Sequence, residues 1–298
     1  MLENATNLQL LNFACLWRQT HSSLPSWCLT LDRESITNTP ETIAYDIYSP
    51  HPFSNDSLLT TFQANNSVLV IKGQVLDYVP FPISVTALSG QLKDASHMEF
   101  FSAVLQLIPD EPSIADITTL LLTITGRASW SPSRGAYRST SENIAFYFWA
   151  YIRHMLRLTT KLTEGTEKSL GVLLYRCRCV IEKLRAFAPQ IPAHELLSVD
   201  DTIGGEEYTA IERVLQYALD ERRFIGRTQA GRLYNSMYSL HEGNAIVVFR
   251  GSDRLFTIRT GGGTTYKLIG DIFVDGFMHG EAYSNKNPDE VDYNIYLN

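Results

Sequence analysis

The residues that could perform chemistry in this sequence are few. Cys177 and Cys179 form a C-x-C pair. On a helix, positions two apart point about 200° away from one another, so these thiols can share neither a metal ion nor a disulfide. The histidines lack the spacing of a zinc site, because they stand at positions 21, 51, 97, 154, 194, 241 and 279. The sequence therefore predicts no catalytic residue, no metal site and no cofactor site.

Two further motifs can each be interpreted in two ways, as a site for chemistry or as a structural turn. His279 and Glu281 could bring an imidazole next to a carboxylate, but no nucleophile or third ligand accompanies them, which favours a turn beside a salt link. The triple glycine at 261–263 could cradle a phosphate only in front of a helix N-terminus. A strand is predicted there instead, so a hairpin turn is favoured. The sequence has no G-x-S-x-G elbow and no P-loop.

The composition is that of an ordinary globular chain. The chain has 298 residues, of which 44% are hydrophobic and 19% are charged, and its net charge is −7. This length predicts two compact units or one large one. The acidic balance argues against binding of nucleic acid or anionic membranes by the whole chain. Four cysteines without an apolar signal segment predict a cytoplasmic protein.

Charge is distributed unevenly along the chain. Residues 153–185 contain eight basic and three acidic side chains, a local balance of +5, whereas residues 195–223 have a balance of −5. Neighbouring helices of opposite charge can neutralise each other, and this is the favoured interpretation. The alternative is a nucleic-acid-binding module that uses the basic helices 153–185.

The elements that must position any site are clearest near the C-terminus. Short runs of β-branched and aromatic residues alternate with Gly, Asn and Asp from residue 224 to residue 283, which predicts a small antiparallel sheet or barrel. The predicted strands cover residues 224–228, 232–237, 245–249, 255–259, 266–269 and 271–274. Residues 245–249 are all apolar, which favours a central strand buried on both faces.

A second strong strand precedes the helical part of the chain. Residues 67–79 are mostly apolar and end at Pro80, and Gly73 within them is a candidate bulge or bend. An isolated strand of this kind would be an aggregation hazard. We therefore expect residues 67–79 to pair with the sheet of residues 224–275, and Leu69→Asp or Val247→Asp to unfold it.

The middle of the chain is predicted to be helical. Ser113 is the expected N-cap of one helix, with Asp116 in its first turn. The nine-residue apolar run 144–152 is too short to span a bilayer. Residues 126–141, rich in Gly, Ser, Pro and Arg, are expected to form a loop. The predicted helices cover residues 98–107, 113–125, 141–162, 168–188 and 206–223.

Together these elements predict an α+β fold with the helices inserted as a separate layer. The predicted organisation is an N-terminal segment with one strand, a helical region, a β-rich block and a tail, at residues 1–97, 98–223, 224–283 and 284–298.

Three segments in the same order resemble one known family. They are L-P-S-W at residues 24–27, the strand at residues 68–79, and F-V-D-G-F-M-H-G-E-A at residues 273–282. This chain resembles the C-terminal region of fungal heterokaryon-incompatibility (HET) domain proteins. It departs from the family pattern at Asn244, where the family has Asp, and at Asp275 and His279, which are interchanged.

The resemblance implies a role in non-self recognition without the HET domain that carries cell-death activity, as a fragment or a paralogue of a HET protein. We therefore expect a non-enzymatic accessory or regulatory region whose partners are other incompatibility proteins. Two alternatives to an accessory region stay open. One is the nucleic-acid-binding module described above, and the other is an enzyme with a cleft between helices and barrel. No membrane partner and no specific small-molecule ligand is predicted.

Overall fold

A computed structural model describes a little under half of the chain. The described residues are 68–80, 85–86, 102–125, 128–131, 135–138, 145, 148–149, 152, 167–187, 224–236, 238–252 and 254–298. The L-P-S-W segment at residues 24–27, the predicted helix 206–223 and the acidic stretch 195–223 lie outside them.

The fold is α+β, as predicted, and the chain divides into two compact units. Unit 1 comprises Met1–Ser84 and Gly226–Asn298, and unit 2 comprises Val85–Ile225. Unit 2 is thus an insertion in the sequence of unit 1. The two-residue strand β2 (Val85–Thr86) pairs with the start of β5 (Phe224–Arg227), so the two ends of the insertion lie on neighbouring strands.

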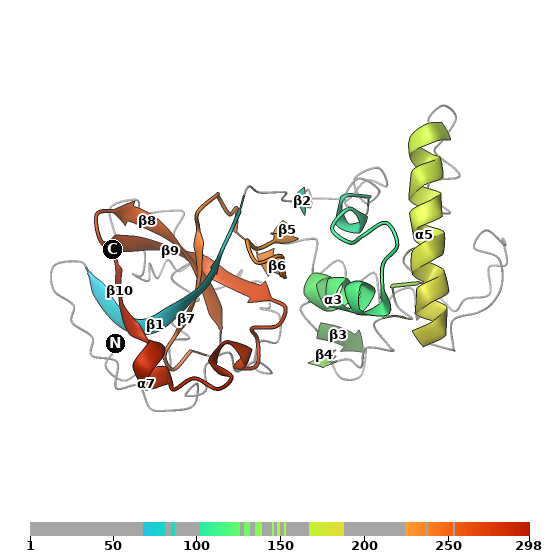
Figure 1. Ribbon diagram of the computed structural model, residues 1–298. Helices are drawn as coiled ribbons and strands as arrows, with labels where there is room; N and C mark the ends of the chain where they lie inside the picture. Colours follow the sequence, from blue (N-terminus) through green and yellow to red (C-terminus); the bar gives the residue numbers. More distant parts are fainter. Residues whose placement is uncertain are drawn as a thin grey trace. The chain divides into compact units, whose positions relative to one another are not determined.

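The sheet of unit 1 is built from both ends of its sequence. Its strands lie in the order β10-β1-β7-β8-β9-β6-β5, with β2 beyond β5 (Figure 1). The other strands are β1 (Leu69–Tyr78), β6 (Leu233–Ser236), β7 (Ala245–Phe249), β8 (Leu255–Gly262), β9 (Thr265–Val274) and β10 (Tyr293–Leu297).

Strand β1 pairs with the C-terminal block, which confirms the expectation for residues 67–79. It runs antiparallel to β7, with Val75 opposite Val247, and antiparallel to β10, with Ile71 opposite Ile295. The irregularity in its pairing lies between Val75 and Asp77, so the bulge predicted at Gly73 is displaced. A Cβ atom at Gly73 would lie 2.4 Å from the carbonyl oxygen of Val248, so glycine is needed there for close approach of two strands.

The C-terminal residues 284–298 are not the tail that the sequence predicted. Strand β10 lies in this stretch and pairs with β1 along five residues. A 3-10 turn, η5 (Glu281–Tyr283), and the short helix α7 (Pro288–Val291) lead into it. The prediction was wrong because β10 contains only two buried side chains, Ile295 and Leu297. Its own sequence therefore shows only a weak hydrophobic pattern, and its pairing with β1 identifies it as a strand.

Two hairpins of the sheet follow the predicted turns. Strands β8 and β9 are joined at Gly262 and Gly263, which have φ of +110° and +65°, so the triple glycine forms a hairpin turn as predicted. The pair β5–β6 turns at Gly231, with φ of +84°. Strand β9 continues through Gly270, where the sequence predicted two separate strands.

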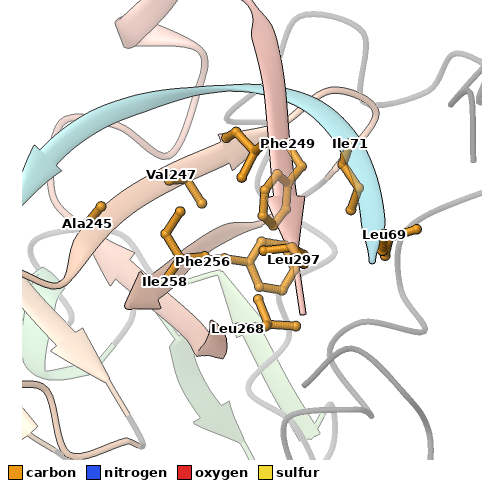
Figure 2. Close-up of a cluster of buried hydrophobic side chains, with 10 residues drawn as sticks. Leu69, Ile71, Ala245, Val247, Phe249, Phe256, Ile258, Leu268 and Leu297 are labelled. Carbon is orange, nitrogen blue, oxygen red and sulfur yellow. The ribbon is translucent and has the colours of Figure 1, made fainter. Parts of the chain in front are cut away.

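Strand β10, at one edge of the sheet, also pairs with β9 at one pair of residues. Leu297 in β10 pairs in parallel with Tyr266 in β9. Strands β10, β1, β7, β8 and β9 therefore form a circuit of pairings. Their buried side chains gather inside it (Figure 2), and the rings of Phe249 and Phe256 lie 5.2 Å apart. The members of this cluster are Leu69, Ile71, Ala245, Val247, Phe249, Phe256, Ile258, Leu268, Ile295 and Leu297.

Unit 2 contains the described helices of the middle of the chain. Helix α3 (Ile114–Thr125) begins as predicted, because the N–H of Asp116 donates to Ser113 Oγ (3.1 Å) and the Asp116 carboxylate accepts from the N–H of Ser113 (2.9 Å). Helix α5 (Glu167–Phe187) matches the predicted helix 168–188. The described residues of the run 144–152 are helical and buried: Ala145, Phe148, Trp149 and Ile152.

Part of the loop predicted at residues 126–141 is a hairpin. Strands β3 (Ala128–Ser131) and β4 (Gly135–Arg138) pair in antiparallel register, with Ser129 opposite Tyr137. The Gly, Ser and Pro content that suggested a loop is also typical of a tight turn between two short strands.

Candidate functional site

The motif at residues 273–282 forms the turn that follows β9. The N–H of Val274 donates to Met278 Sδ (3.5 Å), and the N–H of His279 donates to Glu281 Oε2 (2.6 Å). Gly276 and Gly280 both have φ near +80°, a conformation that favours glycine. The spacing of His279 and Glu281 therefore allows the Glu281 carboxylate to accept a hydrogen bond from the backbone N–H of His279 within a turn.

Arg232 of the neighbouring turn covers this motif. Its guanidinium lies 4.3 Å from the centre of the Phe277 ring and donates to the carbonyl oxygen of Asp275 (3.4 Å). A Cβ atom at Gly276 would lie 2.1 Å from Arg232 Nη1. The residues of this motif are thus engaged in holding β6 and the end of β9 together.

Polar groups inside the sheet are engaged in structural contacts. Arg254 Nη1 and Asp271 Oδ2 form a buried ion pair at 3.3 Å. Ser252 Oγ accepts from the N–H of Arg254 and donates to its carbonyl oxygen, both at 3.0 Å. Asn244 Oδ1 accepts from the N–H of His241 (2.8 Å) and from Arg259 Nη2 (3.3 Å). These contacts fix the ends of β7 and β8.

Among the residues of unit 1 that the structure describes, the exposed aromatic side chains are tyrosines on β1 and β10. Tyr78 is 47% exposed, Tyr293 is 48% exposed and Tyr296 is 40% exposed. Burial raises the pKa of Tyr293, the N–H of Val75 lowers it, and the nearby hydroxyls of Tyr266 and Tyr78 raise it.

Backbone contacts of β1 position two of these exposed tyrosines. The N–H of Val75 donates to Tyr293 Oη (3.2 Å) across the β1–β10 pair. The buried carboxylate of Asp77 accepts from the N–H of Tyr78 (2.8 Å) and from the N–H of Ala230 (3.4 Å). Asp77 therefore anchors the end of β1, and with it Tyr78, to the β5–β6 turn.

Side-chain contacts also hold the segment that leads into β10. Tyr283 Oη donates to Asp292 Oδ1 (2.7 Å), and burial, followed by this carboxylate, raises the pKa of Tyr283. Arg250 Nη1 lies 2.5 Å from Asp289 Oδ1. Asn287 caps α7 by accepting from the N–H of Asp289 (3.2 Å). These contacts place Tyr293 at the start of the strand.

The sequence candidates in unit 2 lie apart from any polar cluster of the described residues. Cys177 is buried, and burial raises the pKa of its thiol to about 12, which makes it a poor nucleophile. Cys179 is half-buried on the same helix. Arg176 bonds to Asp110 and to the carbonyl oxygen of Leu105 (3.0 Å), so this basic residue is engaged within unit 2.

Within the described residues, no three His, Cys, Asp or Glu side chains lie close enough together to hold a metal ion. None of the helices in the described ranges is long and apolar enough to cross a membrane. Comparisons of the chain with protein-family models, with curated proteins and with solved structures gave no match.

The sequence does not single out the exposed tyrosines of β1 and β10. Tyr78 and Tyr293 are far apart in the sequence, and neither stands in a recognisable motif. In the register of the sheet, Tyr293 lies opposite Gly73 of β1, whereas Tyr78 lies opposite Ala245 of β7. The one local signal was the density of tyrosine after Pro288, in Tyr293 and Tyr296.

Proposed function

We propose that this chain is a non-enzymatic accessory or regulatory region of the fungal heterokaryon-incompatibility system and acts in the cytoplasm by binding other incompatibility proteins. Two of the three segments that resemble HET proteins support this proposal through their positions. One is β1 and the other is the turn after β9. Both segments belong to one sheet.

The proposal rests on the contacts that the residues of the motif at 273–282 make. The described contacts of Val274, Met278, His279 and Glu281 hold a turn, and Arg232 packs over Phe277. A motif whose side chains maintain a scaffold fits a binding role better than a catalytic one. Tyr78, Tyr293 and Tyr296 supply exposed aromatic groups of the kind that are enriched at protein interfaces.

A barrel-like closure of five strands of the sheet is part of this proposal. The pairing of Leu297 with Tyr266 supports a small barrel of strands β1, β7, β8, β9 and β10, as expected from the sequence. A barrel of these five strands would cover the edge of β10 that could otherwise pair with another chain. Partner binding would then depend on side chains rather than on strand addition.

Expression of residues 1–298 in a fungal host, alone and with a HET-domain protein, tests the proposed function. We expect normal growth with the chain alone, and we expect the HET-domain protein to be recovered with it in a pull-down. The Val247→Asp variant serves as the unfolded control and should not recover the partner. Growth arrest caused by residues 1–298 alone would contradict the proposal.

A further inference from the structure

We propose that two copies of this chain exchange α7 and β10, so that β10 of each copy pairs with β1 of the other. This inference goes beyond the proposed function and does not depend on the resemblance to HET proteins. We call residues 287–298, which comprise the N-cap Asn287, α7 and β10, the exchanged segment, and residues 284–286 the hinge. Figure 1 shows β10 beside β1.

Little apolar surface holds the exchanged segment in place. Of the residues of β10, only Ile295 and Leu297 are buried, and both belong to the hydrophobic cluster of the sheet. Pro288 is the buried residue of α7. The pairing of β10 with β9 consists of one residue pair, Leu297 with Tyr266. Because the cost of release grows with the apolar area that is uncovered, this segment is easier to release than β7, whose residues are all buried.

The polar contacts of the exchanged segment with the rest of unit 1 can form equally well with a second copy. Tyr283 Oη donates to Asp292 Oδ1 (2.7 Å), and Arg250 forms an ion pair with Asp289. Each of these contacts joins a residue of the segment to a residue outside it. The same is true of the pairing of β10 with β1. Exchange therefore loses none of these contacts, because an identical copy supplies the same partners.

The hinge is exposed and contains a backbone conformation that costs free energy. Residues 284–286 are all exposed. Asn285 has φ of +65°, and in the described part of the chain it is the one non-glycine residue with a positive φ. The N–H of Lys286 donates to the carbonyl oxygen of Tyr283 (2.9 Å) and closes the turn. Exchange extends the hinge and relieves the strain at Asn285, and short strained hinges favour exchange of this kind.

The vacated edge of β1 selects a second copy as its occupant. Release of β10 without exchange would leave the β10-facing edge of Leu69–Gly73 unpaired, and an apolar edge of this kind is an aggregation hazard. A second copy of β10 fits this edge in the register that the sheet already has. Its Ile295 and Leu297 also fill the same positions in the hydrophobic cluster. An unrelated strand would have to match both the register and these side chains.

A pair of cysteines across β1 and β10 distinguishes exchange from other kinds of dimer. Lys72 and Asn294 lie opposite one another, and both are exposed. The carbonyl oxygen of Lys72 accepts from the N–H of Arg250, so the backbone of Lys72 faces β7 and shares no hydrogen bond with Asn294. The Cα atoms of such a pair lie about 4.5 Å apart, within the range of a disulfide. The Lys72→Cys/Asn294→Cys variant therefore links whichever copies of β1 and β10 are paired.

We expect this variant, when reduced and concentrated, to form a dimer that size-exclusion chromatography separates from the monomer. Oxidation of the isolated dimer with oxidised glutathione should give a covalent dimer on a non-reducing denaturing gel. A monomer band from the oxidised dimer would overturn the inference, because each β10 would then be paired within its own chain. The monomer oxidised in dilute solution should stay monomeric when concentrated. Lys72→Cys alone and Asn294→Cys alone control for the native cysteines and should not give the covalent dimer.

Substitutions at Asn285 test the role of the hinge. Glycine adopts a positive φ freely, whereas proline cannot adopt it. We expect Asn285→Gly to lower the dimerisation constant about tenfold and Asn285→Pro to raise it about tenfold. Lys286→Ala, at the next exposed position, is the matched control and should leave the constant unchanged.

Thermal unfolding of each variant checks its fold. If Asn285→Pro does not fold, Asn285→Gly and the cysteine pair still decide the outcome. Absence of a dimer in the unchanged chain and in the folded Asn285 variants would overturn the inference, as would equal dimerisation constants for Asn285→Gly and the unchanged chain.

Discussion

At the scale of residues, a few polar and aromatic side chains fix the strand ends that carry the exposed tyrosines. Asp77 bonds the end of β1 to the β5–β6 turn, and the Tyr283–Asp292 pair holds the chain before β10. Each contact joins segments that are distant in sequence or lie in irregular structure. Sequence patterns report the periodicity of one segment, so these pairings could not be predicted from them.

Tyr234 predicts how stability responds to alkaline pH. Burial raises the pKa of Tyr234 from 10.0 to about 12. Its contribution is therefore fully present below about pH 10 and is lost as the pH rises through 12. We expect this loss to reach about 2–3 kcal/mol for this residue. Urea unfolding at pH 8, 10 and 11.5 should show a weaker pH dependence for Tyr234→Phe, and an unchanged dependence would contradict the assignment.

Asn244 is a residue at which one substitution should stabilise the fold. Its Oδ1 accepts from His241 and Arg259, whereas its buried Nδ2 has no hydrogen-bond acceptor. Asn244→Asp removes this donor and places a carboxylate beside a guanidinium. We expect the free energy of unfolding at pH 7 to rise by about 1 kcal/mol. Asn244→Ala should lower it by about 1–3 kcal/mol, and equal destabilisation by both substitutions would show that the Arg259 contact is weak.

At the scale of elements, strong local patterns predicted the strands and the pairing between them. The run at residues 245–249 is β7, and the apolar strand at residues 67–79 is β1, its neighbour. Elements with weaker patterns were missed. Strand β10 has two buried side chains, and β3 and β4 have four residues each, so only their partners identify them.

The pairing of β1 with β7 predicts the effect of a buried charge. Leu69 and Val247 lie in the core cluster. Leu69→Asp or Val247→Asp would bury a carboxylate without a partner, at a cost of several kcal/mol, and should unfold the sheet. Circular dichroism and limited proteolysis measure the loss. Lys72→Gln, at an exposed position of β1, is the control and should remain folded. A folded Val247→Asp protein would mean that β7 is not at the centre of the core.

At the scale of the whole molecule, unit 1 is a discontinuous domain. Its strand β1 and its C-terminal block are separated by the 85–225 insertion, yet β1 lies between β7 and β10. The two ends of the insertion meet where Val85 pairs with Ile225. Domains inserted in this way commonly have neighbouring ends, so removal of the insertion leaves a gap that a short linker can close.

The central claim is that β1 and the C-terminal block form one cooperative domain. Its most direct test is the thermal unfolding of residues 1–84 joined to residues 226–298 by a flexible linker of about four residues. We predict one cooperative transition with strand-rich circular dichroism, and loss of that transition in the same protein with Val247→Asp. A non-cooperative melt of the unsubstituted protein would contradict the claim, because the sheet would then require the inserted unit in order to form.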